Sequence, residues 1–220
     1  MGPPRLNVLG VIGLTCFVFG MVAAADKKAK PTVDLQVGDS AVLFESTDEN
    51  GEPWKLSDHI GKKFVVVYFY PADFTTGCTK QAEAWRDNMN ALNDAGLEVV
   101  GISGDSVKNH KLFKDAWKLN FTLLADEKAQ IAKKFGVPVS KGGRVRPRGP
   151  DRKLLTDEND KPFRLERKAT FGRWTFVIGK DGKIVYKNTK VRPAQDSQQV
   201  LEFIESSAVG AIGPGPTVAK

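Results

Sequence analysis

Residues 64–70 read Phe-Val-Val-Val-Tyr-Phe-Tyr, an unbroken apolar and aromatic run. Such a run predicts a central strand that is covered by protein on both faces. A short loop with Pro71 and Gly77 follows, and residues 79–95 then place their apolar side chains at helical spacing. Strands also alternate with helical patterns along the rest of the chain, which predicts an α/β fold with a largely parallel sheet.

Cys78 lies between this strand and the helix that follows it. It is one of two cysteines in the chain, and the other, Cys16, falls in an apolar N-terminal leader. Amide groups in the first turn of a helix favour the thiolate, which is the reactive form of cysteine. A free cysteine is often only a small buried hydrophobe, but the loop before Cys78 carries a proline, two threonines and a glycine. We therefore predict that Cys78 is a reactive nucleophile.

The residues around Cys78 resemble the active-site motif of the peroxiredoxins, the alkyl hydroperoxide reductase and thiol-specific antioxidant family. Pro71, Thr75 and Cys78 match the proline, threonine and cysteine of that motif in spacing and order. Residues 68–81 resemble most the bacterioferritin-comigratory-protein subfamily. Residues 173–182 resemble the arginine-bearing strand and hairpin of the family.

The resemblance covers about residues 37–204 and implies a thioredoxin-like fold, with a central mostly parallel or mixed β-sheet flanked by helices. It also implies a thiol-dependent peroxidase that reduces hydrogen peroxide and organic hydroperoxides. No metal or other cofactor is implied, and neither His59 nor His110 has a cysteine at metal-ligand spacing. We expect His110, within a predicted helix at residues 105–117, to be a surface residue.

The resemblance also implies roles for four residues. The Cys78 thiolate attacks the peroxide and becomes a sulfenic acid. Arg173 stabilises the thiolate and donates hydrogen bonds to the peroxide oxygens. Thr75 forms a hydrogen bond with the peroxide, and Pro71 packs over the sulfur. From the residues alone, Arg173 fits a surface ion pair equally well, and Thr75 fits a loop hydroxyl that bonds its own backbone.

Members of the subfamily often carry a resolving cysteine five residues after the nucleophile, where this chain has Glu83. Cys78 is the only cysteine after residue 25. We therefore predict a one-cysteine mechanism, in which an external thiol reduces the sulfenic acid. A thioredoxin-like protein, a glutaredoxin system or a small thiol would each serve as that reductant. We expect a monomer or a weak dimer.

Residues 1–25 have the layout of a secretory signal peptide, with one charge at Arg5, an apolar stretch and three terminal alanines. We therefore predict an exported protein, periplasmic or secreted, that is cleaved near Ala25; an uncleaved membrane anchor is the alternative. Residues 26–207 are predicted to form one peroxiredoxin domain. Residues 208–220, rich in glycine and proline, are predicted to be a disordered tail.

A basic insertion at about residues 138–172 interrupts the resemblance. Residues 141–153 hold six basic side chains against one aspartate, a net +5, whereas residues 26–220 together hold 32 basic and 26 acidic side chains, a net +6. We interpret the segment as a solvated loop near the mouth of the active site. The alternative is binding to nucleic acid, anionic lipid or an acidic partner, but interleaved aromatic residues are missing and no nucleic-acid partner is expected. A non-catalytic thioredoxin-fold binding module that uses residues 141–153 is the alternative function.

Overall fold

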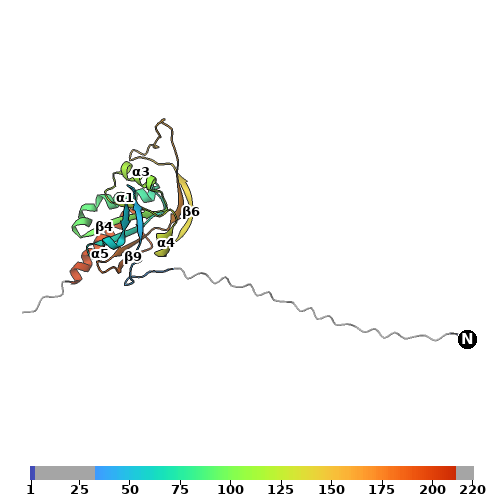
Figure 1. Cartoon of the computed structure of the whole chain (residues 1–220), viewed down its shortest axis with the longest axis horizontal. Coiled ribbons are helices and arrows are strands. Elements are labelled where there is room, and N and C mark those ends of the chain that lie inside the picture. Colours follow the sequence, from blue (N-terminus) through green and yellow to red (C-terminus); the bar gives the residue numbers. More distant parts are fainter. Residues whose placement is uncertain (3–32, 212–220) are drawn as a thin grey trace, which may run out of the picture. The chain divides into compact units, whose positions relative to one another are not determined.

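The chain builds a seven-stranded mixed sheet, in a computed structural model that describes residues 1–2 and 33–211 (Figure 1). The strand order is β2-β1-β5-β4-β3-β8-β9. Strand β4 pairs parallel with β3 and with β5, and the four other neighbouring pairs are antiparallel. The strands of this sheet are β1 (Glu45–Asp48), β2 (Pro53–Lys55), β3 (Phe64–Phe69), β4 (Leu97–Ser103), β5 (Thr122–Ala125), β8 (Trp174–Ile178) and β9 (Ile184–Asn188).

The prediction of a largely parallel sheet is therefore correct only for the three central strands. Strands β1 and β2 are joined by a short turn, as are β8 and β9, and strands joined in this way pair antiparallel. The second turn contains Gly182, whose φ of +79° is a left-handed conformation that favours glycine. The sheet belongs to the mixed α/β type that the resemblance implied.

Helices cover the two faces of the sheet unequally. Helices α1, α2, α3 and α5 contribute apolar side chains to one core cluster, and α4 contributes to the other. Strand β3 supplies both clusters, because Val66 and Tyr68 pack in the first while Val65, Val67 and Phe69 pack in the second. The prediction of a strand covered on both faces is confirmed for residues 64–69, and Tyr70 follows the strand. The helices are α1 (Thr76–Asp87), α2 (Met89–Asp94), α3 (Val107–Trp117), α4 (Gln130–Lys134) and α5 (Asp196–Ala211), with 3-10 turns η1 (Leu56–Asp58) and η2 (Pro193–Gln195).

The helix predicted at residues 79–95 is divided into α1 and α2 at Asn88, where φ is −93° and ψ is 4°. The side-chain Nδ2 of Asn88 donates hydrogen bonds to the Ala84 carbonyl (3.1 Å) and to Ser197 Oγ (2.9 Å). The bond to Ser197 connects the break to the start of α5. The bond to the Ala84 carbonyl competes with the backbone hydrogen bonds of a continuous helix.

The two predicted ends fall mostly beyond the described residues. Residues 3–25 of the predicted signal peptide and residues 212–220 of the predicted tail lie outside them. Helix α5 continues to Ala211, four residues past the predicted domain boundary at residue 207. Among the described helices, none is both long and apolar enough to cross a membrane.

The basic insertion contains a two-stranded antiparallel ribbon, β6 (Val139–Val145) paired with β7 (Leu165–Phe171), rather than a loop alone. The strands approach so closely that a Cβ at Gly142 would lie 2.0 Å from the Arg167 carbonyl oxygen. Ala169 and Phe171 of β7 are buried in the second core cluster, which fastens the ribbon to the sheet.

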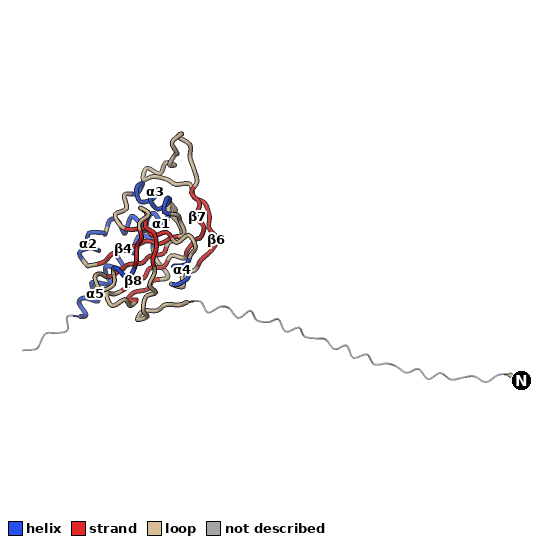
Figure 2. The backbone as a smooth tube through the Cα atoms, in the orientation of Figure 1, coloured by secondary structure: helices blue, strands red, loops and turns tan. Residues whose placement is uncertain are grey.

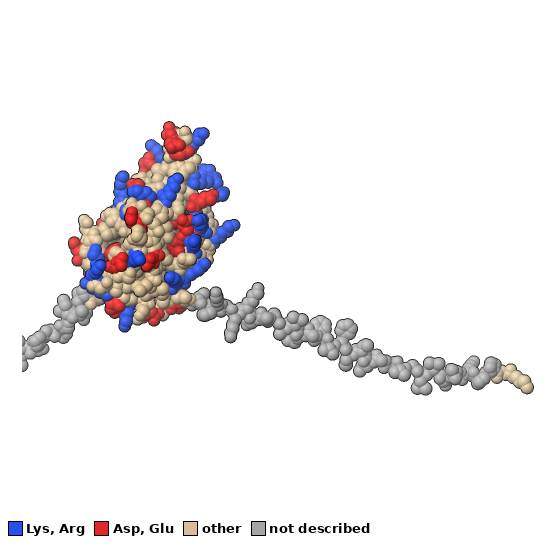
Figure 3. All heavy atoms as spheres, in the orientation of Figure 1, with Lys and Arg blue, Asp and Glu red and all other residues tan. Residues whose placement is uncertain are grey.

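The connection between β6 and β7 projects beyond α3 (Figure 2). Figure 3 shows acidic side chains next to basic ones over the face that it displays, including the tip of the projection. The basic residues of the insertion therefore do not form a uniform positive surface on this face.

Candidate active site

Strand pairing places the loop after β3 against the residue that precedes β8. The two strands are antiparallel, and Phe69 lies opposite Trp174 at the end of the pair. The chain continues from Phe69 through a loop into α1, whose first turn carries Cys78, while Arg173 directly precedes Trp174. Arg173 Nη2 donates a hydrogen bond to Cys78 Sγ over 3.2 Å. Two predicted site residues that are 95 positions apart are thus in direct contact.

The surroundings of Cys78 favour a negatively charged sulfur. Its side chain is 1% exposed, and it is the free cysteine among the described residues. The helix dipole of α1 presents partial positive charge at the first turn. The guanidinium of Arg173 keeps its charge at any physiological pH, so the hydrogen bond to the sulfur is charge-assisted when the sulfur is a thiolate.

A chain of buried polar groups orients Arg173. Its Nη1 donates to Gln81 Oε1, and Gln81 Nε2 donates to Asp196 Oδ2 over 2.6 Å. Thr175 Oγ1 donates to the same carboxyl oxygen over 2.8 Å. Burial raises the pKa of Asp196 to about 6, although the hydrogen bonds from Thr175 and Gln81 and the nearby Arg173 charge oppose that rise. The sequence analysis missed this chain, although Gln81 lies one helical turn after Cys78.

Gly77 leaves room for the arginine. A Cβ at this position would lie 3.3 Å from Arg173 Nη2, which is tighter than an ordinary contact. Glycine therefore lets the guanidinium rest against the first turn of α1, where it reaches the sulfur.

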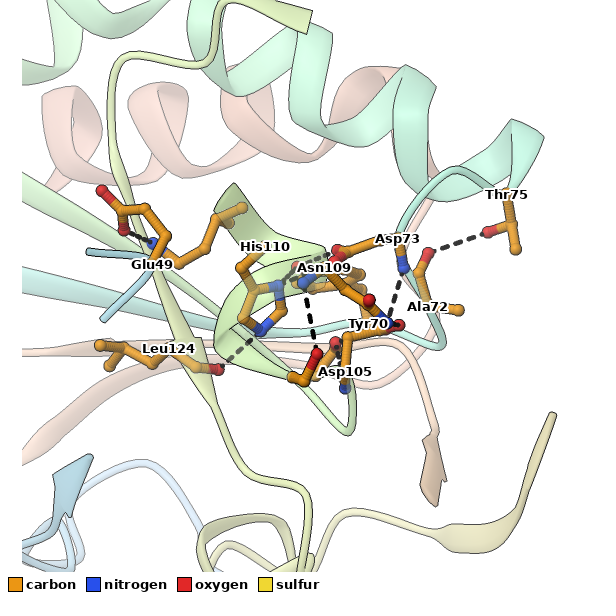
Figure 4. A network of polar contacts seen from close by, with 12 residues as sticks. Glu49, Tyr70, Ala72, Asp73, Thr75, Asp105, Asn109, His110 and Leu124 are labelled. Carbon is orange, nitrogen blue, oxygen red and sulfur yellow. Dashed lines mark hydrogen bonds and ion pairs between the residues drawn. The ribbon is translucent and has the colours of Figure 1, made fainter. Parts of the chain in front are cut away.

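Thr75 and Pro71 lie in the loop before the helix. Thr75 is the residue preceding α1, with extended backbone angles, and its carbonyl accepts a hydrogen bond from the Thr79 amide over 2.8 Å. Its Oγ1 donates to the Ala72 carbonyl over 3.2 Å (Figure 4). The hydroxyl thus bonds its own loop, and its oxygen lone pairs remain able to accept a further bond. Pro71 is partly buried at the start of the loop.

Asp73, a residue of the same loop that sequence reasoning did not single out, anchors the loop to neighbouring elements (Figure 4). The Asp73 carboxylate accepts a hydrogen bond from Tyr70 OH over 2.8 Å and lies 2.9 Å from His110 Nδ1. Its backbone amide donates to Asp105 Oδ2 over 3.0 Å. Burial, followed by the Asp73 charge, raises the pKa of Asp105 to about 6. Asp73 therefore ties the active-site loop to the end of β4 and to α3.

The prediction that His110 is a surface residue is wrong, because its side chain is fully buried. Its second ring nitrogen, Nε2, lies 3.2 Å from the Leu124 carbonyl oxygen, which can only accept a hydrogen bond. Burial alone would lower the pKa of His110, but the Asp73 carboxylate and the bonds to it raise that pKa above its ordinary value. Phe113, three residues further along α3, is also buried, and this spacing was the available signal that His110 faces inward.

Replacing His110 with glutamine should lower the free energy of unfolding by about 3 kcal/mol near pH 6, because Asp73 loses its buried cation. The folded-state pKa of His110 is raised, so its stabilisation is complete below the ordinary value of 6.5 and is lost as pH rises through the raised value. The difference between wild type and variant should therefore shrink at pH 9. Urea unfolding at both pH values measures it.

The control for this experiment is His59→Gln. His59 pairs with Glu98 over 2.7 Å, but the two side chains remain 24% and 21% exposed. We expect a loss of about 1 kcal/mol or less. A His110→Gln effect of equal size at pH 6 and pH 9 would contradict a charged His110.

A sulfur that is shielded from water, held by a permanent cation and placed at a helix N-terminus is suited to repeated oxidation and reduction. Such a site is typical of enzymes that use a reactive cysteine, redox enzymes among them. The chain belongs to the AhpC/TSA family, whose model matches residues 37–187. The protein is accordingly a peroxiredoxin, a thiol-dependent peroxidase, and the predictions of that family and of an enzyme are confirmed.

Individual relatives agree with the family. The chain is 37% identical to chloroplastic peroxiredoxin Q of Suaeda salsa over 181 residues, covering 81% of this chain and 72% of the relative. It is 39% identical to chloroplastic peroxiredoxin Q of Sedum lineare over 171 residues, covering 77% of each. The crystal structure of peroxidoxin BcpB from Mycobacterium tuberculosis superimposes with a TM-score of 0.62 at 28% identity, covering 78% of this chain and 97% of that one. The predicted thioredoxin-like fold is confirmed.

The comparisons contradict the predicted export. Both plant relatives are named as chloroplastic proteins, which points to a plastid and away from the periplasm or secretion. The prediction rested on an apolar N-terminal stretch and its small terminal residues, which lie outside the described residues.

Proposed function

We propose that this peroxiredoxin reduces hydrogen peroxide and organic hydroperoxides through Cys78 alone and is recycled by an external thiol. The observation that carries the proposal is the hydrogen bond from Arg173 Nη2 to Cys78 Sγ. It supports a thiolate nucleophile with a fixed donor beside it, which is what cleavage of an O–O bond requires.

In the oxidative step, the Cys78 thiolate attacks one peroxide oxygen and the O–O bond breaks. The sulfur gains that oxygen as a sulfenic acid, and the other oxygen leaves with a proton as water or an alcohol. Arg173 donates to the oxygens as negative charge develops on them. The Thr75 hydroxyl, which already donates to the Ala72 carbonyl, accepts a hydrogen bond from the peroxide in this step, and Pro71 limits access of water.

In the reductive step, an external thiol attacks the sulfenic sulfur, forming a mixed disulfide and releasing water. A second thiol then displaces Cys78, so that one external disulfide is formed for each peroxide. Glu83 occupies the position where members of the subfamily often carry a resolving cysteine, and residues 26–220 contain no cysteine except Cys78. These residues support the one-cysteine cycle.

One equivalent of hydrogen peroxide, added without reductant, should convert Cys78 to a sulfenic acid that a dimedone-type reagent traps as a single adduct. Excess peroxide should give the irreversible sulfinic acid. Mass spectrometry under non-reducing conditions measures both products. We expect a disulfide between two chains to be minor, because the sulfur is buried; a disulfide-linked dimer as the main product would overturn the one-cysteine cycle.

A further inference from the structure

A cavity of about 620 Å³ lies against the outer side of helix α1. Its walls combine Thr79 and Glu83 of α1 with Trp117 at the end of α3 and with part of the basic insertion. The Trp117 indole Nε1 donates to the Arg148 carbonyl over 3.2 Å, which joins the insertion to α3 at this point. A volume of this size is typical of small-molecule sites.

Three cations line the cavity: Lys80 from α1, and Arg148 and Arg152 from the insertion. None of the three forms an ion pair with a carboxylate among the described residues. Arg148 Nη1 donates to the Arg152 carbonyl over 2.7 Å, so one arginine braces the turn that carries the other. Glu83 is the one carboxylate among the described lining residues, and its Oε1 lies 4.0 Å from Arg86 Nη2. The cavity therefore offers three positive groups and one negative group beside the apolar ring of Trp117.

Phe74 belongs both to the wall of the cavity and to the core around Cys78. Its backbone φ is +57°, a left-handed conformation that costs energy for a bulky residue. Because Cys78 is buried, a thiol bound in the cavity would reach the sulfur only when Phe74 moves, and leaving this backbone conformation relieves that cost.

We propose that this cavity binds the external reductant, and that the reductant is a small peptide thiol with two carboxylates and one ammonium group, of the glutathione type. The inference rests on the proposed one-cysteine function, because only that cycle needs an external thiol. The two carboxylates match the cations Lys80, Arg148 and Arg152, and the ammonium matches Glu83. Arginine suits this role because its planar group binds carboxylates through two parallel hydrogen bonds.

The described residues around the cavity do not form the apolar patch that a stable protein complex would use. A stable protein interface has an apolar centre of several exposed large side chains. Among the described residues, the exposed large hydrophobic side chains are Met1, Val33, Val37, Leu43 and Val139, and none of them lines the cavity.

The test compares two thiols on the sulfenic acid formed by one equivalent of hydrogen peroxide. Glutathione carries both carboxylates and cysteamine carries none. In the full-chain double variant Arg148→Ala/Arg152→Ala, the ratio of the glutathione rate to the cysteamine rate should fall at least about tenfold. The matched control, Lys141→Ala/Lys153→Ala, removes the same charge from the same insertion outside the cavity lining, and its ratio should change by less than about twofold.

A binding measurement tests whether the cavity binds the thiol, without relying on the reaction at Cys78. S-methylglutathione, which cannot react, should bind the reduced wild-type chain in a calorimetric titration, and the arginine double variant should bind at least about tenfold more weakly. An equal rate ratio in both double variants, or no binding of S-methylglutathione, would overturn the site. If instead the arginine variant slowed only oxidation by a carboxylate-bearing hydroperoxide, the cavity would be a peroxide site and the inference would be wrong. Failure of wild type to form the sulfenic acid would refute the proposed function. The titration would still show whether the cavity binds the glutathione analogue.

Discussion

Cys78→Ser should reduce peroxide consumption to the uncatalysed background while the protein remains folded. Serine is nearly the same size as cysteine, so the buried site keeps its packing, and its hydroxyl can still accept the hydrogen bond from Arg173. A hydroxyl with its ordinary reactivity cannot replace a thiolate as the nucleophile, and it cannot form a sulfenic acid. Peroxide consumption with excess reductant measures activity, and circular dichroism measures folding.

Cys16→Ser is the natural control for this substitution, because Cys16 is the only other cysteine of the chain. We expect it to retain the wild-type rate. Peroxidase activity that survived in Cys78→Ser and disappeared in Cys16→Ser would show that the nucleophile has been assigned to the wrong sulfur.

Arg173→Met should slow oxidation of Cys78 by hydrogen peroxide at least about tenfold, because the variant loses a charged donor to both the thiolate and the developing oxyanion. Methionine keeps much of the side-chain volume without the charge. Alkylation of Cys78 by iodoacetamide at neutral pH should slow as well, because the sulfur loses its cationic hydrogen-bond donor. Stopped-flow measurement of the oxidation and a time course of alkylation test the two effects separately.

Arg173→Lys separates the effect of the charge of Arg173 from the effect of its planar hydrogen-bonding group. Lysine keeps the charge but cannot bond Gln81 and the sulfur through one planar group as Arg173 does. We expect a rate between those of wild type and Arg173→Met. Arg144→Met, an exposed arginine paired with Glu166, controls for general charge loss. Unchanged oxidation and alkylation in Arg173→Met would place Arg173 outside the catalytic machinery.

The sequence predicted the elements that carry the reaction because each has a strong local pattern. The apolar run at residues 64–70, the loop to Cys78 and the Asp-Gly turn after β8 can each be recognised from neighbouring residues alone. The match of two short motifs then connected Cys78 with Arg173, which are far apart in the chain.

The groups that support the site could not be predicted in the same way, because they depend on contacts between distant elements. A histidine in a polar stretch looks solvent-exposed, and His110 is buried only because Asp73 and the Leu124 carbonyl meet it from a loop and from β5. Asp196 looks like an ordinary acidic residue at a helix start, but it accepts bonds from Gln81 and Thr175. The pairing of β6 with β7 was not predicted, because β6 holds two glycines and two charged residues and β7 holds three charged residues.

The antiparallel pairing of β3 with β8 sets the distance between Arg173 and Cys78. Val66 pairs with Val177 and Phe69 with Trp174, and a slip of one residue would turn every side chain of β8 to the opposite face of the sheet. Arg173 would then point away from Cys78, although no residue of the site had changed. Apolar residues in the middle of the sheet therefore help to set the position of Arg173 beside the sulfur, and substitutions that loosen this pairing are expected to reduce catalysis before they unfold the protein.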